Sequence, residues 1–367
     1  MTTQNVWLKL HQWVGLTGAV FILIMGFTGS ALVFENEIDR VLNPSTSYVT
    51  PQAQRLPLAE LVARANAADP KDPVGGISIK DKPDLAFELS SRVRRSISIN
   101  QYTGEILGTR NRETSFARFL HLLHTRFVAG QVGEWIAGWF TVLMLFLAIS
   151  GIVLWWPRKI FSLKNASSWK RTNFDLHNVL GFYSSIVMFF IAFTAVLIAF
   201  EATMDPLVLK LNGGAAPPAD AAKLQSSPAP GAVRITPDAA LAIAEQTLPG
   251  VFVSSVSIPG NPKAVYRLLA KFPEDRTPAG RSRVYLDQFT GKVLLAENTR
   301  TAPLGTRILN LKRSAHTGDI LGAPTQTLYF IVSFGIGVQV MTGVLIWWNS
   351  RKPKRSRARR PVDESAA

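Results

Sequence analysis

Residues 10–35 have the sequence LHQWVGLTGAVFILIMGFTGSALVFE, and residues 176–201 have the sequence LHNVLGFYSSIVMFFIAFTAVLIAFE. Both segments begin with Leu-His, carry Phe-Thr 16 residues after the histidine and end with Phe-Glu. Between the histidine and the glutamate neither contains a charged residue. Each is longer than the roughly 20 residues that a helix needs to cross the hydrocarbon core of a bilayer. The two segments therefore predict two copies of one membrane-spanning helix.

Two further uncharged segments, Trp135–Pro157 and Leu321–Ser350, show the same duplication. A His-Thr pair precedes each of them, and a Trp-Trp pair follows each histidine by 31 residues. We therefore predict four spans in two parallel repeats, each made of a span, an outer module and a second span. A parallel repeat implies a pseudo-twofold axis along the membrane normal.

The chain has 367 residues and a net charge of +15, but only 18% of its residues are charged, against about 25% in soluble proteins. Its basic residues gather in the short loop between spans two and three and after span four: Arg158, Lys159, Lys164, Lys170, Arg171, Arg351, Lys352, Lys354, Arg355, Arg357, Arg359 and Arg360. This bias predicts cytoplasmic termini and outer long loops. The tail then contacts membrane lipid, and a nucleic-acid partner is not required. We expect span one to be an uncleaved anchor because its apolar run is longer than that of a signal peptide.

Each long loop predicts a small α+β module. Helical segments are expected at 56–67 and 236–246, and strands near 76–79, 86–91, 251–258 and 264–271. A further pair of strands in each module flanks the turns Thr103-Gly104 and Thr290-Gly291. The Ala/Pro/Ser-rich segment 213–231 predicts a linker.

The predicted fold class is thus an α-helical membrane protein, a four-helix bundle of two parallel repeats with two small periplasmic α+β modules. The first repeat comprises span one at 1–34, module one at 35–115 and an amphipathic helix (116–127) with span two at 116–157. A cytoplasmic loop follows at 158–176. The second repeat comprises span three at 177–201, the linker and module two at 202–312, and span four at 313–350, before a basic tail at 351–367.

Four of the five histidines occupy matched positions. His11 and His177 lie at the cytoplasmic ends of their spans, and His124 and His316 lie on the outer side. Two opposed imidazoles give a six-coordinate electron-transfer haem, so these residues predict two haem sites, one per leaflet. Zinc is disfavoured, because each pair has at most one carboxylate nearby, Asp175 or Asp319. A hydrogen-bonded or interfacial role is the ordinary alternative for any single histidine.

His121 is an alternative ligand to His124, because it lies three residues earlier on the same helical face. Arg118 and Arg126 could pair with haem propionates or form a solvated face. The chain has no cysteine, which excludes iron–sulfur clusters, disulfides and cysteine nucleophiles. It has no Walker loop, and no cytoplasmic segment large enough for NADPH or a flavin. Electrons must therefore come from an unidentified cytoplasmic donor.

The segments 10–16, 28–29, 123–124, 151–157 and 316–319 resemble the PepSY-associated transmembrane family, and the two outer modules resemble its PepSY domains. Some members are di-haem ferric-siderophore reductases of the bacterial inner membrane. The resemblance implies two haem b groups, a periplasmic ferric siderophore as substrate, and His11, His177, His124 and His316 as the haem-associated histidines. The chain departs from the pattern at Ala195, which stands where span one has Gly29.

Two other functions fit the sequence. One is a non-enzymatic PepSY membrane regulator that binds a periplasmic partner. The other is a subunit of a siderophore or metal transporter. Of the three functions we expect the reductase, an oxidoreductase that carries electrons across the membrane to iron.

Overall fold

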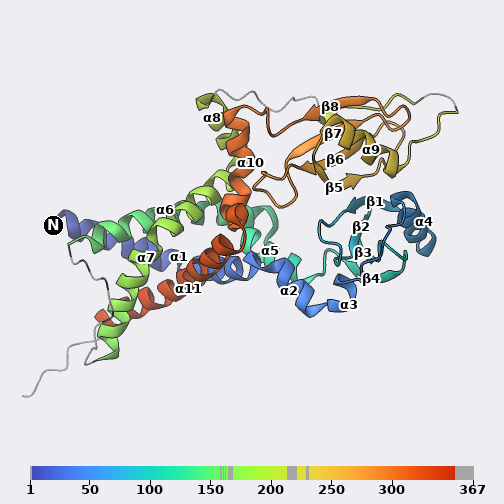
Figure 1. Cartoon of the computed structure of the whole chain (residues 1–367). Coiled ribbons are helices and arrows are strands. Elements are labelled where there is room, and N and C mark those ends of the chain that lie inside the picture. Colours follow the sequence, from blue (N-terminus) through green and yellow to red (C-terminus); the bar gives the residue numbers. More distant parts are fainter. Residues whose placement is uncertain are drawn as a thin grey trace, which may run out of the picture.

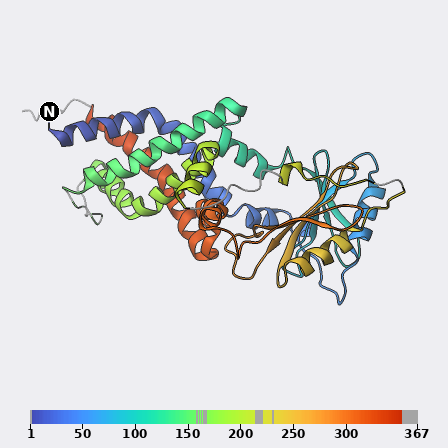
Figure 2. The ribbon, with the colours of Figure 1, turned by 90° about the horizontal axis from the view of Figure 1, so that it is seen from above.

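The computed structural model describes residues 2–157, 159, 161, 163, 168–212, 221–228 and 231–351. It has two parts, a bundle of long helices and a domain built on a β-sheet (Figure 1). The two parts lie end to end when the molecule is seen from above (Figure 2). Most of the predicted linker (213–220, 229 and 230) and the basic tail from residue 352 onward are outside the described residues.

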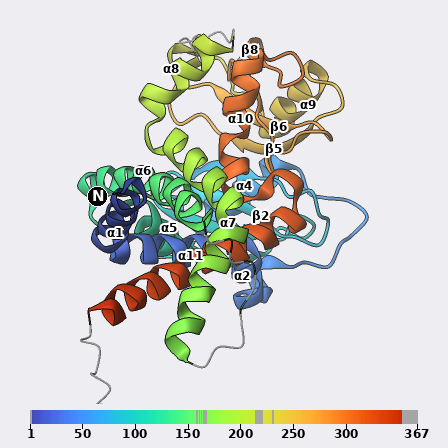
Figure 3. The same cartoon turned by 90° about the vertical axis from the view of Figure 1, so that its left-hand side faces the viewer.

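Four helices are long and apolar enough to cross a membrane: α1 (Thr3–Val33), α6 (Gly130–Trp155), α7 (Trp169–Ala199) and α11 (Ala323–Ser350). The chain is therefore a helical, multi-pass membrane protein, as predicted. α1 and α7 each pack against both α6 and α11 (Figure 3). The contact between α1 and α11 is close, since Ser333 donates a hydrogen bond to the carbonyl of Gly26 at 3.0 Å. Small residues permit such an approach of two backbones.

The sheet contains eight antiparallel strands in the order β4-β3-β2-β1-β5-β6-β7-β8. The first half of the chain contributes β1 (Val74–Ser78), β2 (Phe87–Ser91), β3 (Arg95–Ile99) and β4 (Ile106–Asn111). The second half contributes β5 (Phe252–Ser257), β6 (Tyr266–Lys271), β7 (Ser282–Leu286) and β8 (Val293–Glu297). β1 pairs with β5 through Gly76, Ile77 and Ser78. The two predicted modules thus share one sheet, and their pairing removes two exposed strand edges.

The predicted module helices are α4 (Leu58–Ala68) and α9 (Pro237–Thr247). They contact each other and pack against the sheet. One hydrophobic core runs through both halves, and it includes Leu61, Ile77, Leu89, Ala244, Val256 and Leu268. The Thr-Gly turns are present, with Gly104 at φ +73° and Gly291 at φ +71°, a region that glycine enters without steric cost.

Shorter helices connect the sheet to the bundle: α2 (Glu35–Leu42), α3 (Pro44–Ser47), α5 (Phe116–Arg126), α8 (Glu201–Leu211), η1 (Ala221–Lys223), α10 (Leu304–Thr317) and η2 (Asp319–Leu321). The predicted amphipathic helix is α5. In both halves a histidine-bearing helix ends before the next span begins. The break after α5 has Phe127 and Val128 at positive φ, and the break after α10 has Gly318 and Gly322 there.

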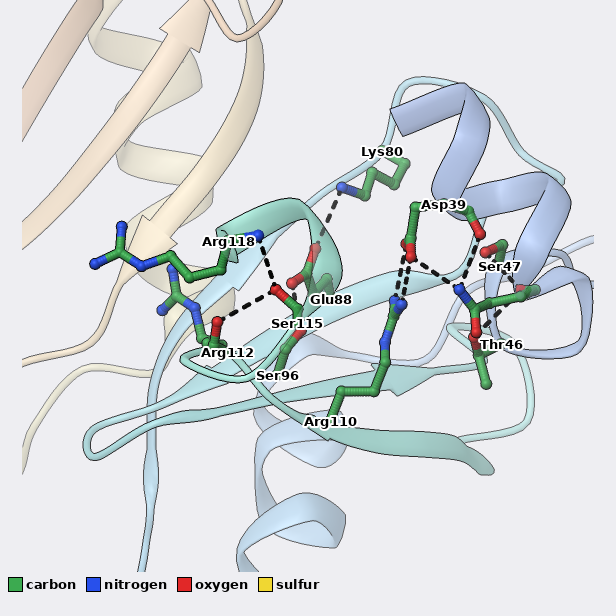
Figure 4. A network of polar contacts seen from close by, with 11 residues as sticks. Asp39, Thr46, Ser47, Lys80, Glu88, Ser96, Arg110, Arg112, Ser115 and Arg118 are labelled. Atoms are coloured by element: carbon green, nitrogen blue, oxygen red, sulfur yellow. Dashed lines mark hydrogen bonds and ion pairs between the residues drawn. The ribbon is translucent and has the colours of Figure 1, made fainter. Parts of the chain in front are cut away.

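The two halves attach to the bundle differently. In the first half, Arg110 of β4 donates two hydrogen bonds to the Asp39 carboxylate of α2, at 2.6 and 3.0 Å (Figure 4). Asp205 is the matched residue in α8, and its partner is Lys312 of α10, at 2.7 and 2.8 Å. The first contact therefore joins the sheet to a connecting helix, whereas the second joins two connecting helices to each other.

Candidate functional site

The outer histidines face each other. His124, near the end of α5, and His316, near the end of α10, have ring centroids 6.4 Å apart and ring planes inclined at 45°. These residues are 192 positions apart in the chain, and the helix breaks after α5 and α10 place them together. His124 is thus the histidine of α5 that lies against the second half.

Hydroxyl groups of the spans hold both outer rings. Nδ1 of His124 lies 3.0 Å from Oγ1 of Thr28 in α1, and Nδ1 of His316 lies 3.2 Å from Oγ1 of Thr194 in α7. Nδ1 of His316 also donates to the carbonyl of Ile191 at 3.1 Å. Thr28 and Thr194 are the threonines of the two repeated Phe-Thr pairs.

The inner histidines line one cavity. His11 of α1 and His177 of α7 both border a partly open space of about 290 Å³ that is lined by residues of all four spans. Nδ1 of His11 lies 2.7 Å from Oγ of Ser150 in α6. Nδ1 of His177 lies 2.9 Å from Oγ1 of Thr342 in α11 and donates to the carbonyl of Gln339 at 3.0 Å.

Carbonyl and hydroxyl contacts assign the tautomer of three of the four imidazoles. Each hydroxyl lies within hydrogen-bond distance of a carbonyl of its own helix: Thr28 of Ile24, Ser150 of Leu147, Thr194 of Phe190 and Thr342 of Gln339. The carbonyls of Gln339 and Ile191 can only accept, so Nδ1 of His177 and of His316 carries the proton. Thr28 donates to the Ile24 carbonyl at 2.6 Å and therefore accepts from Nδ1 of His124. Ser150 lies 3.3 Å from the Leu147 carbonyl and 2.7 Å from Nδ1 of His11, so this hydroxyl does not decide the tautomer of His11. A neutral ring in this state has its lone pair on Nε2, the arrangement found in metal-binding histidines.

The outer rings are kept neutral by their surroundings. Burial lowers the pKa of His124 to about 3, and the neighbouring His316 acts in the same direction. Burial also lowers the pKa of His316, although its hydrogen bond to the Ile191 carbonyl opposes the shift. Neutral imidazole is the form that binds a metal ion.

Glycines on adjacent helices leave room for three of the rings. A Cβ atom added to Gly29 would lie 2.9 Å from Cε1 of His124, and one added to Gly343 would lie 3.1 Å from Cε1 of His177. At Gly151 the corresponding distance to Cε1 of His11 is 3.7 Å. Ala195 occupies the matched position in α7, next to Thr194. The glycines therefore make space for histidine rings as well as for helix packing.

The alternative ligand His121 lies one turn before His124, and its Nδ1 is buried without a hydrogen-bond partner among the described residues. The two arginines predicted near the outer site pair with neighbouring acids. Arg118 lies 3.6 Å from Glu113, and Arg126 lies 3.1 Å from Glu134. Neither pair involves a histidine.

Each site offers two imidazoles and no third protein ligand. Within the part of the chain that the structure describes, no three His, Asp or Glu side chains gather closely enough to hold a metal ion. A structural zinc site takes four protein ligands, so neither pair suffices for zinc alone.

The helices, the joined modules and the paired histidines can now be compared with known families. The model of the PepSY-associated TM region matches residues 8–350. The chain belongs to this family. The match begins before His11 and ends at Ser350, the last residue of α11, so it includes all four paired histidines. A comparison with curated proteins finds no match.

Sequence reasoning missed the hydroxyl partners of the histidines. Thr28 and Thr194 stand in the repeated Phe-Thr pairs, and Ser150 and Thr342 directly precede the repeated Gly151 and Gly343. Their equal spacing was the available signal. The spacing alone did not indicate what these hydroxyls do. The structure shows that each one contacts a ring nitrogen.

Proposed function

We propose that this member of the PepSY-associated family is an oxidoreductase that carries electrons across the bacterial inner membrane through two bis-histidine haem b groups. It reduces the iron of a periplasmic ferric siderophore with electrons from a cytoplasmic donor. The observation that carries the proposal is the placement of four histidines in two pairs, the outer pair face to face and the inner pair on one cavity, each ring bonded at Nδ1 to a hydroxyl.

The outer pair fits a haem. His124 and His316 would hold the haem iron between them. The ring centroids of His124 and His316 are 6.4 Å apart. A haem also requires only two axial ligands, which is the number each site supplies. When bound, such a group accepts and donates single electrons.

The protein's own residues keep the outer rings neutral and hold all four rings at Nδ1. The two sites lie at different depths, because α1 contributes His11 near its start and Thr28 near its end. Between these residues the helix rises by about 25 Å. Two sites at these depths divide the path of the electron across the membrane into shorter transfer steps.

We propose a topology with both termini in the cytoplasm and the sheet domain in the periplasm. The basic loop between spans two and three and the basic tail support this orientation. The matched order of helices and strands in the two halves supports two parallel repeats. The outer histidines then lie on the side of the sheet domain, where a ferric chelate would arrive.

The chemistry at the outer side is a one-electron reduction of Fe(III) to Fe(II). Hard oxygen ligands bind Fe(III) tightly, and the softer Fe(II) is held less firmly. The siderophore is not altered, and the iron is released from it.

Haem stoichiometry tests the proposal. We expect two haems per chain in protein purified from haem-replete cells, and one haem in each of the variants His11→Ala and His124→Ala. The control His121→Ala should retain two haems. Folded protein without haem, or a loss of haem in His121→Ala but not in His124→Ala, would contradict this assignment.

A vesicle assay tests the direction of transfer. Protein is reconstituted with a reductant inside and a ferric chelate with a ferrous-iron trap outside. We expect Fe(II) to form outside with the wild-type protein and not with the double variant His11→Ala/His124→Ala. Uptake of the intact chelate without reduction would favour a transporter.

A further inference from the structure

Basic side chains gather where the sheet domain meets the outer ends of α5 and α10. His121 and Arg313 each precede an outer histidine by three residues, so each lies on the helical face of that histidine. Since the two outer histidines face each other, His121 and Arg313 lie close to the same region. Burial lowers the pKa of His121, and the charges of Arg313 and Arg118 lower it further.

The sheet domain contributes Arg281 to this group. Arg281 directly precedes β7, where the backbone N–H of Thr299 donates to Oγ of Ser282 at 3.1 Å. This contact places Arg281 beside the segment that leads into α10. Burial lowers the pKa of Arg281, and the charges of Arg283 and Arg313 act in the same direction.

Two cations of this group, Arg281 and Arg313, form no ion pair among the described residues, and Arg118 has only a long contact of 3.6 Å with Glu113. Nε of Arg118 and Nε of Arg281 are buried without a hydrogen-bond partner among the described residues. Arg313 interacts with Glu35 at longer range. Arg283, by contrast, pairs with Glu297 at 2.8 Å. A buried guanidinium nitrogen without an acceptor is costly, even where the rest of the group reaches solvent.

Figure 4 shows that Arg118 and Arg112 both extend toward the strands of the second half. Arg112 is exposed, and Arg313 is exposed as well. The group therefore combines half-buried guanidinium groups with groups that a ligand can reach from the surface. Guanidinium groups bind carboxylates and similar oxyanions through paired hydrogen bonds.

We propose that Arg281, Arg313 and Arg118 bind the anionic oxygens of the ferric chelate beside the outer histidine pair. The proposal rests on the proposed function and specifies its substrate as a chelate of net negative charge with carboxylate or catecholate oxygens. Uncharged or cationic trihydroxamate chelates should bind poorly. Haem propionates are a second source of the same oxyanion chemistry, and the experiment separates the two.

The test measures binding of gallium(III) citrate to the purified full-length protein, because gallium(III) resembles iron(III) but is not reduced under these conditions. We expect Arg281→Gln to weaken binding about tenfold, the loss of one charge-assisted contact. Arg281→Lys, which keeps the charge but loses the paired hydrogen bonds, should bind with an affinity between those of the wild type and Arg281→Gln. The control Arg267→Gln, an exposed arginine of β6, should bind as the wild type does. A neutral gallium trihydroxamate should bind weakly to every variant.

Three results would overturn the proposal. One is equal affinity of the wild type and folded Arg281→Gln for gallium citrate, and another is tighter binding of the neutral chelate. The third is a shift of the haem absorption spectrum or midpoint potential in Arg281→Gln with unchanged gallium binding, which would assign the arginine to the propionates. Because gallium binding needs no electron transfer, it can be measured even if the proposed reductase activity is absent.

Discussion

The two halves of the chain agree at their histidines and differ where they meet the sheet. Each of the four paired histidines bonds through Nδ1 to a hydroxyl of a neighbouring helix. The links to the sheet and its helices are not matched. Arg110 joins β4 to α2 only in the first half, and Asp238 of α9 caps α4 across the halves. The hydrogen bonds that hold the rings are therefore the same in both halves, whereas the contacts that attach the sheet differ between them.

The largest expected effect concerns Gly29, the glycine beside the ring of His124. In Gly29→Ala the new Cβ would lie 2.9 Å from Cε1 of His124 and 3.0 Å from Oγ of Ser333. Both contacts are too short, so the ring must move. We expect the haem content to fall from two to one per chain, measured by absorption after extraction of the haem.

The matched control is Gly151→Ala, where the new Cβ would lie 3.7 Å from Cε1 of His11. This is an ordinary van der Waals distance, and we expect both haems to remain. If Gly29→Ala retained two haems with an unchanged spectrum, the space beside His124 would not be required for the ring.

The sequence predicted the spans and the histidine pairs for one reason. Uncharged segments and equal spacings are local patterns, and a parallel repeat converts them into positions that face each other. His124 and His316 accordingly lie together. The same reasoning did not predict the joined sheet, because the pairing of β1 with β5 involves two strand edges whose sequences do not specify a partner.

The hydroxyl partners were missed for a different physical reason. Ser and Thr inside a helix commonly bond to the carbonyl four residues earlier, and Thr28 and Thr194 do so. Their second contact, to a ring nitrogen, joins residues about a hundred positions apart. No local pattern distinguishes a hydroxyl with this contact from one without it.

The second prediction compares the two hydroxyls of the inner site. Ser150→Ala removes the hydroxyl bonded to Nδ1 of His11, whereas Thr342→Val leaves His177 its bond to the Gln339 carbonyl. Loss of such a supporting contact typically weakens metal binding 10–100-fold. We expect Ser150→Ala to reach this range and Thr342→Val to fall below it, measured by haem titration of the stripped protein. Equal losses would show that the carbonyl of Gln339 contributes nothing.

The third prediction concerns the contact between α9 and α4. The Asp238 carboxylate accepts hydrogen bonds from the backbone N–H groups of Leu58 and Ala59, at 2.7 and 2.8 Å. It thereby caps a helix whose preceding residue, Pro57, provides no side-chain cap. We expect Asp238→Ala to destabilise the sheet domain by about 1–2 kcal/mol, seen as a lower thermal midpoint of the full-length protein.

The control for this contact is Glu60→Gln. Glu60 lies in the same first turn of α4 but forms only an exposed pair with Arg64, at 2.7 Å. Such pairs contribute little, so the midpoint should hardly change. A drop as large as that of Asp238→Ala would mean that general charge near the helix start, rather than the cap across the halves, stabilises α4.

The smallest expected effect lies in the matched carboxylates of α2 and α8. Lys312 is largely buried, with 14% of its side chain exposed, and contacts both Glu201 and Asp205, whereas Arg110 is 37% exposed and contacts Asp39. Removing Lys312 therefore leaves two carboxylates without their cation. We expect Lys312→Gln to cost about 1 kcal/mol and Arg110→Gln about half of that, compared by thermal midpoints of full-length variants. Because salt screens exposed charges most, the effect of Arg110→Gln should vanish first as the NaCl concentration is raised. A larger cost for Arg110→Gln would show that the sheet depends on its link to α2 more than the connecting helices depend on each other.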